Sequence, residues 1–139
     1  TPQEVYTLAS IVEKETLQKS EKARIAGVYL NRLSVGMPLQ ADPTAVFARK
    51  DFLARRVTDF HTKFDSPYNT YKYPGLPPGP ITMSSISSID AVINYEKHDF
   101  LYFCAIGDES GLHAFATNLS EHNKNARNYR DNLIKRGLR

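Results

Sequence analysis

The pattern of apolar and polar positions at the start of the chain predicts two helices. Thr1 and Pro2 fit a helix N-cap followed by proline at the first helical position. Apolar side chains then recur at helical spacing at Val5, Leu8, Ala9 and Val12. A second helix is predicted over residues 21–33, where apolar residues gather on one side and Gly36 stands just beyond the expected end. We expect these two helices to pack as a hairpin.

The helical period is mostly lost between Ser34 and Pro80, where Pro, Gly, Asn and Tyr become frequent. The exception is a short candidate helix after Asp42 and Pro43. An irregular stretch of this length is uncommon inside a compact domain unless it forms a binding site or a lid. The sequence therefore predicts a long irregular substrate loop.

The last third of the chain returns to regular structure and includes a predicted β-hairpin. A helix is expected over residues 84–94, followed by strands over 100–106 and 112–117 that a Gly-containing turn connects. Asn118 and Glu121 resemble a capping box that opens a final helix. The predicted fold class is α+β, a mainly helical domain with a small β-hairpin and the long irregular substrate loop.

Length and composition indicate one compact domain over residues 1–139. A chain of this size closes a hydrophobic core without disulfides or metal ions, and Cys104 is its only cysteine. The net charge is +3, and the bases near the C-terminal end are interleaved with Asn and Asp, which favours a solvated helix face over a nucleic-acid surface. No apolar stretch approaches the roughly 18 residues that cross a bilayer. We expect any membrane anchor to lie outside this chain.

Two carboxylates, Glu13 and Glu15, lie on the first predicted helix among apolar neighbours. At about 100° per residue, Glu15 stands roughly 50° from the mean direction of the apolar side chains, and Glu13 stands more than about 110° from it. Partial burial disfavours the charged form of a carboxyl, so the pKa of Glu15 is expected to rise toward about 6, as a general acid requires. Glu13 is expected to be an ordinary exposed carboxylate. An i, i+4 pair of Glu15 with Lys19 is the structural alternative.

Polar and aromatic side chains of the loop region are candidates for sugar binding. They provide the amides, hydroxyls and flat rings that hold pyranose rings and N-acetyl groups: Gln40, Tyr68, Asn69, Thr70 and Tyr71. Core packing is the alternative for the two tyrosines. Asp42 could contact sugar, cap the short helix that follows it, or do both. The four histidines show no metal-ligand spacing, and we expect neither a metal site nor a cofactor.

Segments in order along nearly the whole chain carry a recognisable pattern. They run from Leu8 to Thr16, Gln40 to Thr44, Ser66 to Tyr71, Gly75 to Ile81 and Glu121 to Asn123, with agreement also at Tyr102-Phe103 and from His113 to Phe115. Together they resemble the YceG-like (MltG) endolytic murein transglycosylase family. Its catalytic glutamate lies in an Ile/Val-Glu-Lys-Glu-Thr/Ser segment, and lysozyme-like transglycosylases place that glutamate directly before Ser or Thr. The resemblance therefore implies that Glu15 is the catalytic residue, with Glu13 as the alternative.

The resemblance implies a lysozyme-like catalytic domain that cuts the β-1,4 bond between N-acetylmuramic acid and N-acetylglucosamine in peptidoglycan. Most glycosidases use two carboxylates, but here only Glu15 is suited. A lytic transglycosylase can use one, because its nucleophile is the C6 hydroxyl of the substrate, which then closes a 1,6-anhydro-N-acetylmuramic acid end. Two alternatives stay open: a lysozyme-type hydrolase that uses Glu15 with Asp42, and a non-catalytic glycan-binding module.

The resemblance also implies the setting in which such a domain works. Family members carry an N-terminal transmembrane helix and a LysM-like domain, and they cleave nascent strands beside peptidoglycan synthases. We therefore expect the chain to be the catalytic part of a longer, membrane-anchored protein on the extracytoplasmic, periplasmic face of the inner membrane. Its expected partners are peptidoglycan glycan strands and peptidoglycan synthases, with no nucleic acid.

Overall fold

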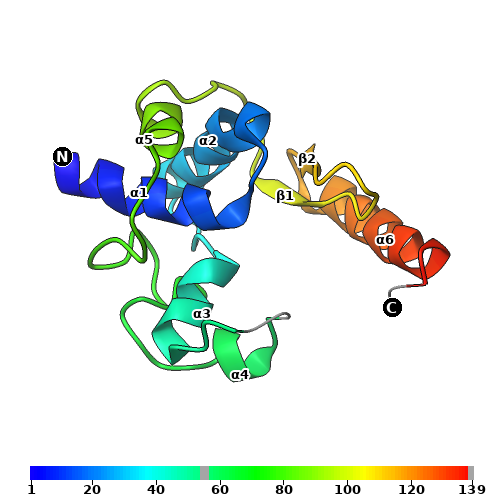
Figure 1. Ribbon diagram of the computed structural model, residues 1–139, viewed down its shortest axis with the longest axis horizontal. Coiled ribbons are helices and arrows are strands. Elements are labelled where there is room, and N and C mark those ends of the chain that lie inside the picture. The colour runs from blue at the N-terminus through cyan, green and yellow to red at the C-terminus, as the bar shows by residue number, and fades with distance from the viewer. Residues whose placement is uncertain (54–56, 138–139) are drawn as a thin grey trace.

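The computed structural model describes residues 1–53 and 57–137 of the chain. Its elements run in the order α1 (Pro2–Glu15), α2 (Lys19–Val35), α3 (Asp42–Arg49), α4 (Asp59–Thr62), α5 (Ile86–Ile93), β1 (Tyr102–Ala105), β2 (His113–Ala116) and α6 (Leu119–Lys135). Helices dominate, and the two strands form an antiparallel hairpin (Figure 1). The predicted α+β class, mainly helical with one small hairpin, is confirmed.

α1 begins where the sequence predicts. The Thr1 hydroxyl accepts a hydrogen bond from the Glu4 backbone N–H at 3.2 Å, and the Glu4 carboxylate accepts one from the Thr1 amino group at 2.9 Å. Pro2 occupies the start of the helix, where its nitrogen needs no partner. The helix ends at Glu15 because Thr16 adopts an extended backbone with a φ of −151°. Glu15 therefore stands at the last helical position, beside the turn that leads into α2.

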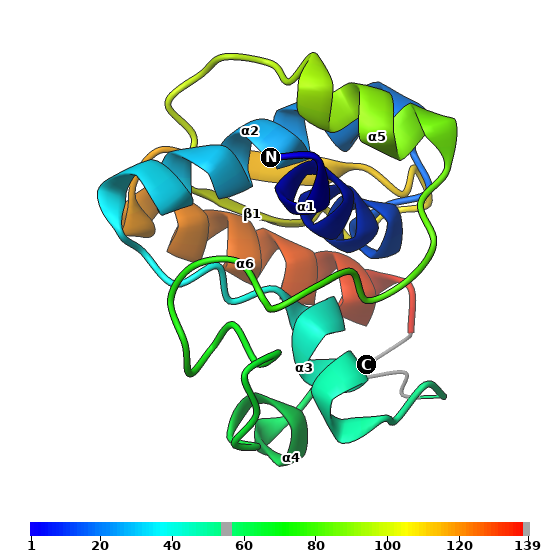
Figure 2. The ribbon, with the colours of Figure 1, turned by 90° about the vertical axis from the view of Figure 1, so that its left-hand side faces the viewer.

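α1, α2 and α5 pack together around the main hydrophobic core (Figures 1 and 2). Their apolar sides supply almost fully buried side chains, among them Leu8, Ile11, Val12, Ile25 and Tyr29. The predicted contact between the first two helices is confirmed. α2 extends beyond the predicted range at both ends. It stops at Gly36, which takes a left-handed φ of 76° and donates its N–H to the carbonyls of Arg32 and Leu33.

The segment between α2 and α5 contains more regular structure than its sequence predicts. α3 agrees with the short helix expected after Asp42 and Pro43, whereas α4 has no counterpart in the prediction. The expectation that Asp42 caps α3 is wrong, because Ala41 is the N-cap residue and Asp42 is the first residue of the helix. Figures 1 and 2 show α3 and α4 as a group below the three packed helices.

The hairpin and α6 form the remaining part of the domain. Tyr102 pairs with Ala116 at one end of the hairpin, and both strands are shorter than predicted but lie within the predicted ranges. As expected, Asn118 caps α6 by accepting a hydrogen bond from the Glu121 backbone N–H at 2.9 Å. α6 packs against both strands (Figure 1).

Polar contacts fasten the hairpin to α2. The Arg32 side chain donates from Nε to the Leu101 carbonyl at 2.7 Å. The Glu21 carboxylate accepts a hydrogen bond from the His113 backbone N–H at 2.9 Å, and its other oxygen lies 2.9 Å from Nδ1 of the same histidine. These contacts hold the hairpin beside the packed helices, and a pocket lies where the two parts meet.

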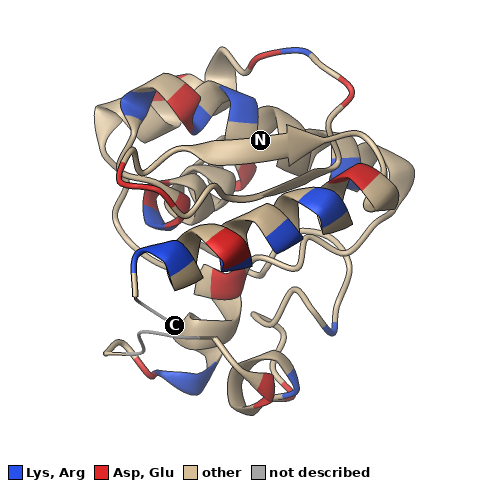
Figure 3. Ribbon diagram, turned by 90° about the vertical axis from the view of Figure 1, so that its right-hand side faces the viewer, with Lys and Arg blue, Asp and Glu red and all other residues tan. Residues whose placement is uncertain are grey.

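Lys and Arg positions lie along the outer side of α6, with acidic positions among them (Figure 3). These charged positions are exposed, as a solvated helix face should be. Cys104 is partly buried and carries a free thiol. Over residues 1–53 and 57–137, none of the helices combines the length and the apolar character that crossing a membrane requires.

Candidate active site

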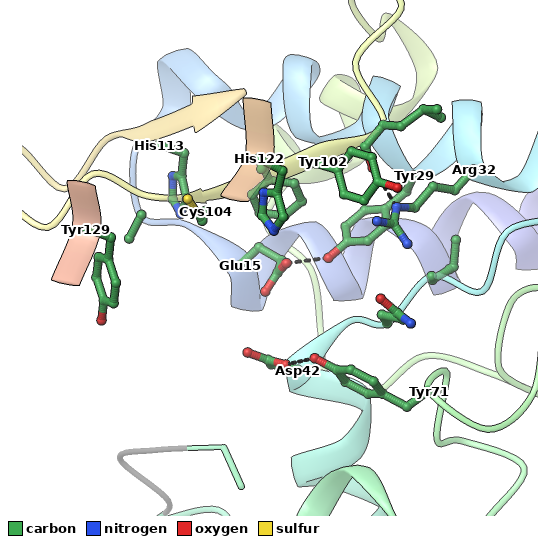
Figure 4. Close-up of a pocket in the computed structure, with 15 residues that line it drawn as sticks. Glu15, Tyr29, Arg32, Asp42, Tyr71, Tyr102, Cys104, His113, His122 and Tyr129 are labelled. Atoms are coloured by element: carbon green, nitrogen blue, oxygen red, sulfur yellow. Dashed lines mark hydrogen bonds between the residues drawn. The ribbon is translucent and has the colours of Figure 1, made fainter. Parts of the chain in front are cut away.

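A pocket of about 420 Å³ lies between α1 and α2, the start of α3, and the hairpin with α6 (Figure 4). Its polar lining comes from segments far apart in the sequence: Glu15, Tyr29, Arg32, Gln40, Asp42, Tyr71, His113 and His122. Glu15 and Asp42 also line a second hollow of about 320 Å³, whose wall is mostly apolar. The two carboxyl groups therefore stand where the two hollows meet.

The end of α1 places the Glu15 carboxyl inside this pocket. Burial is the main cause that raises its pKa to about 7; a hydrogen bond from the Tyr29 hydroxyl opposes the rise, and the negative charge of Asp42 adds to it. The rise expected from the position of Glu15 on the helix is confirmed. The alternative pair with Lys19 does not form within the described residues, since α1 ends at Glu15 and Lys19 begins the next helix. A carboxyl with this pKa can both give and take a proton near neutral pH.

Tyr29, from the middle of α2, orients Glu15. The tyrosine is 2% exposed, and its hydroxyl donates to Oε2 of Glu15 (Figure 4). Burial and the negative charge of Glu15 raise the pKa of Tyr29 well above its ordinary value, so the hydroxyl stays a neutral donor. In the described part of the chain Oε1 of Glu15 has no hydrogen-bond donor, which leaves that oxygen available to a ligand.

Glu13, two positions earlier on α1, has different surroundings. Its carboxylate accepts hydrogen bonds at 2.7 to 3.0 Å from the backbone and hydroxyl of Ser85 and the hydroxyl of Ser88. These bonds, with Lys22 at 3.7 Å, lower its pKa to about 2. The side chain is 28% exposed, so the expectation of an ordinary exposed carboxylate is wrong. Glu13 is a charged link between α1 and the start of α5 and is poorly suited to donate a proton.

Asp42 and Tyr71 form a second pair of carboxylate and tyrosine, facing Glu15 and Tyr29 across the pocket (Figure 4). The Tyr71 hydroxyl donates to Oδ1 of Asp42. Asp42 stands in the first turn of α3, where the partial positive charge of the helix N-terminus favours a carboxylate. Burial, followed by the bond to Asp42, raises the pKa of Tyr71 above its ordinary range. Gln40 lines the same pocket and adopts a left-handed φ of 50°.

The structure does not bring Tyr68, Asn69 and Thr70 to this lining. Asn69 is fully buried, and its amide nitrogen donates to the backbone carbonyls of His61 and Thr62 in α4 and of Phe64 just after it, at 2.7 to 3.4 Å. The Thr70 hydroxyl accepts a hydrogen bond from the Ala41 backbone N–H at 2.9 Å. The Tyr68 ring packs with its centre 4.9 Å from that of Phe47. These three residues hold the loop that carries Tyr71.

Several residues of the pocket wall have no role in the site that could be predicted from their sequence pattern. The helical pattern assigns Tyr29 to the core, and the one hint of a further role is that a buried tyrosine hydroxyl needs a partner. Arg32, Tyr102 and His122 come together only when the hairpin and α6 fold onto α2. Among the residues that the structure describes, no three His, Cys, Asp or Glu side chains lie close enough together to hold a metal ion.

Comparison with known proteins identifies the family. Residues 1–128 match the YceG-like family. The chain belongs to this family. The endolytic murein transglycosylase of Bacillus subtilis is 43% identical over 128 residues, and the protein of that name from Streptococcus pneumoniae serotype 2 is 40% identical over 130 residues. Each match covers 90% of this chain but only 34% and 23% of the respective relative.

A solved YceG-like structure has the same fold. The crystal structure of a YceG-like protein from Listeria monocytogenes matches this chain with a TM-score of 0.80 and 45% sequence identity. The match covers 85% of this chain and 38% of that chain. The family member described here thus spans about a third or less of the length of the curated relatives.

Asn69→Ala should lower the melting temperature. The change removes the amide from three backbone carbonyls, of which that of His61 keeps a hydrogen bond from the Phe64 backbone N–H. An unpaired buried group costs about 1–3 kcal/mol. Tyr71→Phe is the matched control from the same loop, because it removes only a hydroxyl at the pocket edge and should shift the melting temperature by no more than a few degrees. Circular dichroism melting curves measure both. An Asn69→Ala protein of wild-type stability and weakened glycan binding would instead place Asn69 against the sugar.

Glu15→Gln should remove a pH-dependent cost of folding. The pKa of Glu15 is about 7 in the folded protein against an ordinary 4.5, so between these values the unfolded chain has released a proton that the folded protein keeps. Wild-type stability therefore falls as the pH rises through this window. The advantage of the variant in free energy of unfolding should grow by about 1–3 kcal/mol between about pH 4 and about pH 8, measured by urea denaturation.

Glu13→Gln is the control, because the pKa of Glu13 is shifted in the opposite direction from that of Glu15. The folded-state pKa of Glu13 is about 2, so its stabilising contribution is present above its ordinary value of 4.5 and is lost as the pH falls toward 2. This variant should be less stable than the wild type at neutral pH, and the difference should shrink in acid. Parallel pH curves for the two variants would contradict both assignments.

Proposed function

We propose that this domain is an endolytic lytic transglycosylase that cuts the glycan strands of bacterial peptidoglycan, with Glu15 as its acid and base. The observation that carries the proposal is a buried carboxyl with a pKa of about 7 that lines an open pocket. The names of the relatives from Bacillus subtilis and Streptococcus pneumoniae support the reaction class.

The reaction needs one group that donates a proton and then accepts one. In its protonated form, Glu15 donates a proton to the glycosidic oxygen as the bond from N-acetylmuramic acid to N-acetylglucosamine breaks. The resulting carboxylate then takes the proton of the muramyl C6 hydroxyl, whose oxygen bonds to the anomeric carbon. The new end is 1,6-anhydro-N-acetylmuramic acid, and no water is consumed. A pKa near 7 suits both steps, because neither form of Glu15 is strongly favoured at neutral pH.

Tyr29 keeps the Glu15 carboxyl in one orientation by donating to a single oxygen. We assign Gln40, Asp42 and Tyr71 to substrate binding, because all three line the pocket that holds Glu15. Tyr68, Asn69 and Thr70 would then serve the substrate indirectly, by holding the loop that carries Tyr71.

Hydrolysis of the same bond is the second candidate, and the position of Asp42 favours it. Asp42 lies in the pocket with Glu15 and is close enough for its charge to raise the pKa of that carboxyl. A second carboxylate could activate a water molecule, as in glycosidases that use two acidic residues. The two candidates differ in whether water enters the product.

The setting of the domain is also a proposal. The family resemblance supports a longer protein, anchored in the membrane outside the segment described here, that acts on the extracytoplasmic face beside peptidoglycan synthases. The greater length of the relatives is compatible with such added parts.

Digestion of purified peptidoglycan in heavy-oxygen water should give products that end in 1,6-anhydro-N-acetylmuramic acid and contain no label. Closure of the ring by the substrate's own C6 hydroxyl leaves no place for water. Mass spectrometry of the released fragments makes the distinction. Labelled reducing ends would establish the hydrolase that uses Glu15 and Asp42.

Glu15→Gln should lower turnover by about 100- to 10,000-fold, the range typical of a lost general acid and base. The amide keeps the shape of the side chain but neither donates a proton to the leaving oxygen nor removes one. Glu13→Gln is the matched comparison, and at a temperature well below its melting point it should lose no more than about tenfold, because its carboxylate binds Ser85 and Ser88 and does not line the main pocket. Full activity of both variants would show that turnover does not depend on Glu15. A wild-type domain that binds peptidoglycan but does not cut it would favour a non-catalytic glycan-binding module.

A further inference from the structure

One corner of the pocket holds three side chains that the proposed proton transfers do not use. Arg32 comes from α2, Tyr102 from β1 and His122 from α6 (Figure 4). The central carbon of the Arg32 guanidinium lies 5.0 Å from the centre of the Tyr102 ring. The His122 ring stacks on the same tyrosine, with the ring centres 5.0 Å apart and the planes 23° from parallel. We call this cluster the Arg32 corner.

Arg32 is a buried cation that no carboxylate balances in the described part of the chain. It is 7% exposed. Its Nε and one terminal nitrogen donate to the carbonyls of Leu101 and Pro38, both at 2.7 Å. The other terminal nitrogen has no hydrogen-bond partner among the described residues. Burial lowers the pKa of Arg32. A buried charge without a counter-charge is costly, and an oxygen atom brought by a ligand would reduce that cost.

His122 adds a second incompletely bonded group. Its Nδ1 is buried and has no hydrogen-bond partner among the described residues. Burial, with the charge of Arg32, lowers the pKa of His122, so the ring is neutral at pH 7. A neutral imidazole offers one donor and one acceptor, and Figure 4 shows the ring directed toward the space above Glu15. A cationic donor and a neutral polar ring thus both pack against the Tyr102 ring at the pocket wall.

We propose that the Arg32 corner binds an acyl oxygen of a sugar residue beside the scissile bond, so that the pocket selects acylated glycan. The inference rests on the proposed function, which supplies the glycan. A guanidinium donates strong, charge-assisted hydrogen bonds to carboxylates, and it also donates to the carbonyl oxygen of an acyl group. A sugar hydroxyl is a weaker hydrogen-bond acceptor than an amide carbonyl or a carboxylate, and it balances a buried cation less well. Peptidoglycan offers acyl oxygens from two sources, the N-acetyl groups and the muramyl lactyl group, and the lactyl group is a carboxylate where its peptide stem is absent.

The test measures affinity in a Glu15→Gln background, which should bind glycan without cutting it. Three soluble fragments are compared by titration calorimetry: strands with peptide stems, strands stripped of stems, and strands stripped of N-acetyl groups. Adding Arg32→Gln should raise the Kd for stem-bearing strands about tenfold or more, the usual effect of losing a hydrogen bond to a charged group. Binding of the lactyl group predicts that removing the stem tightens binding only while Arg32 is present. Binding of the N-acetyl group predicts that deacetylation abolishes the difference between the two proteins.

Arg24→Gln is the matched control on α2, because Arg24 forms an exposed ion pair away from the pocket, and it should leave every Kd unchanged. Arg32 also fastens the hairpin, so His122→Phe provides an independent test if Arg32→Gln fails to unfold cooperatively. Phenylalanine keeps the stacking on Tyr102 and removes both ring nitrogens, and it should weaken binding without lowering the melting temperature.

The corner and the proposed catalysis can fail separately. The acyl site would be overturned if a folded Arg32→Gln protein bound all three fragments as tightly as the Glu15→Gln protein does. The same result for His122→Phe would overturn it where Arg32→Gln does not fold. Neither result would affect the transglycosylase proposal. A chain with native Glu15 that shows the Arg32-dependent acyl preference but cuts no glycan would overturn the catalytic proposal alone.

Discussion

Burial of the Glu15 carboxyl against the Tyr29 hydroxyl is the interaction on which the rest of the site depends. A carboxyl at a helix end would ordinarily reach water and ionise near its usual pKa of 4.5, but here the pKa is about 7. Burial is the main cause of the raised pKa, and the hydrogen bond from Tyr29 limits the rise. Because α1 and α2 pack through the core, the distance between acid and tyrosine is set by the same apolar contacts that stabilise the domain. The geometry of the pocket and the folding of the domain therefore depend on one set of interactions.

The same helix carries a carboxyl with the opposite behaviour two positions earlier. Glu13 accepts hydrogen bonds from Ser85 and Ser88 at the start of α5, and these keep it charged. A charged group there ties the last turn of α1 to α5, while the neighbouring face of that turn presents a carboxyl that is easily protonated. The contrast follows from helix geometry, since residues two positions apart point in very different directions at about 100° per residue.

Features governed by local periodicity could be predicted from the sequence, and features that depend on distant partners could not. The burial of Glu15, the capped starts of α1 and α6, and the hairpin follow from short patterns. The surroundings of Glu13 could not be predicted in this way, because its partner Ser85 is 72 positions away in the sequence. Asn69 and Tyr71 look equally suited to binding sugar in the sequence, yet one is fully buried and the other lines the pocket. Irregular loops have no period from which such a difference could be inferred.

The construction of the pocket explains why the family resemblance is spread along nearly the whole chain. Most of the segments that carry it contribute to the pocket wall: the end of α1 provides Glu15, the start of α3 provides Asp42, the loop after α4 provides Tyr71, and α6 provides His122. No short motif could form this site, because its walls belong to parts of the domain that meet through contacts such as the one from Arg32 to the Leu101 carbonyl. That contact fixes the hairpin, which faces Glu15, to α2, which carries the tyrosine that orients Glu15. Any change that loosens the hairpin should therefore alter the pocket before it alters the helical core, since the hairpin adds only the partly buried Phe103 and Phe115 to that core.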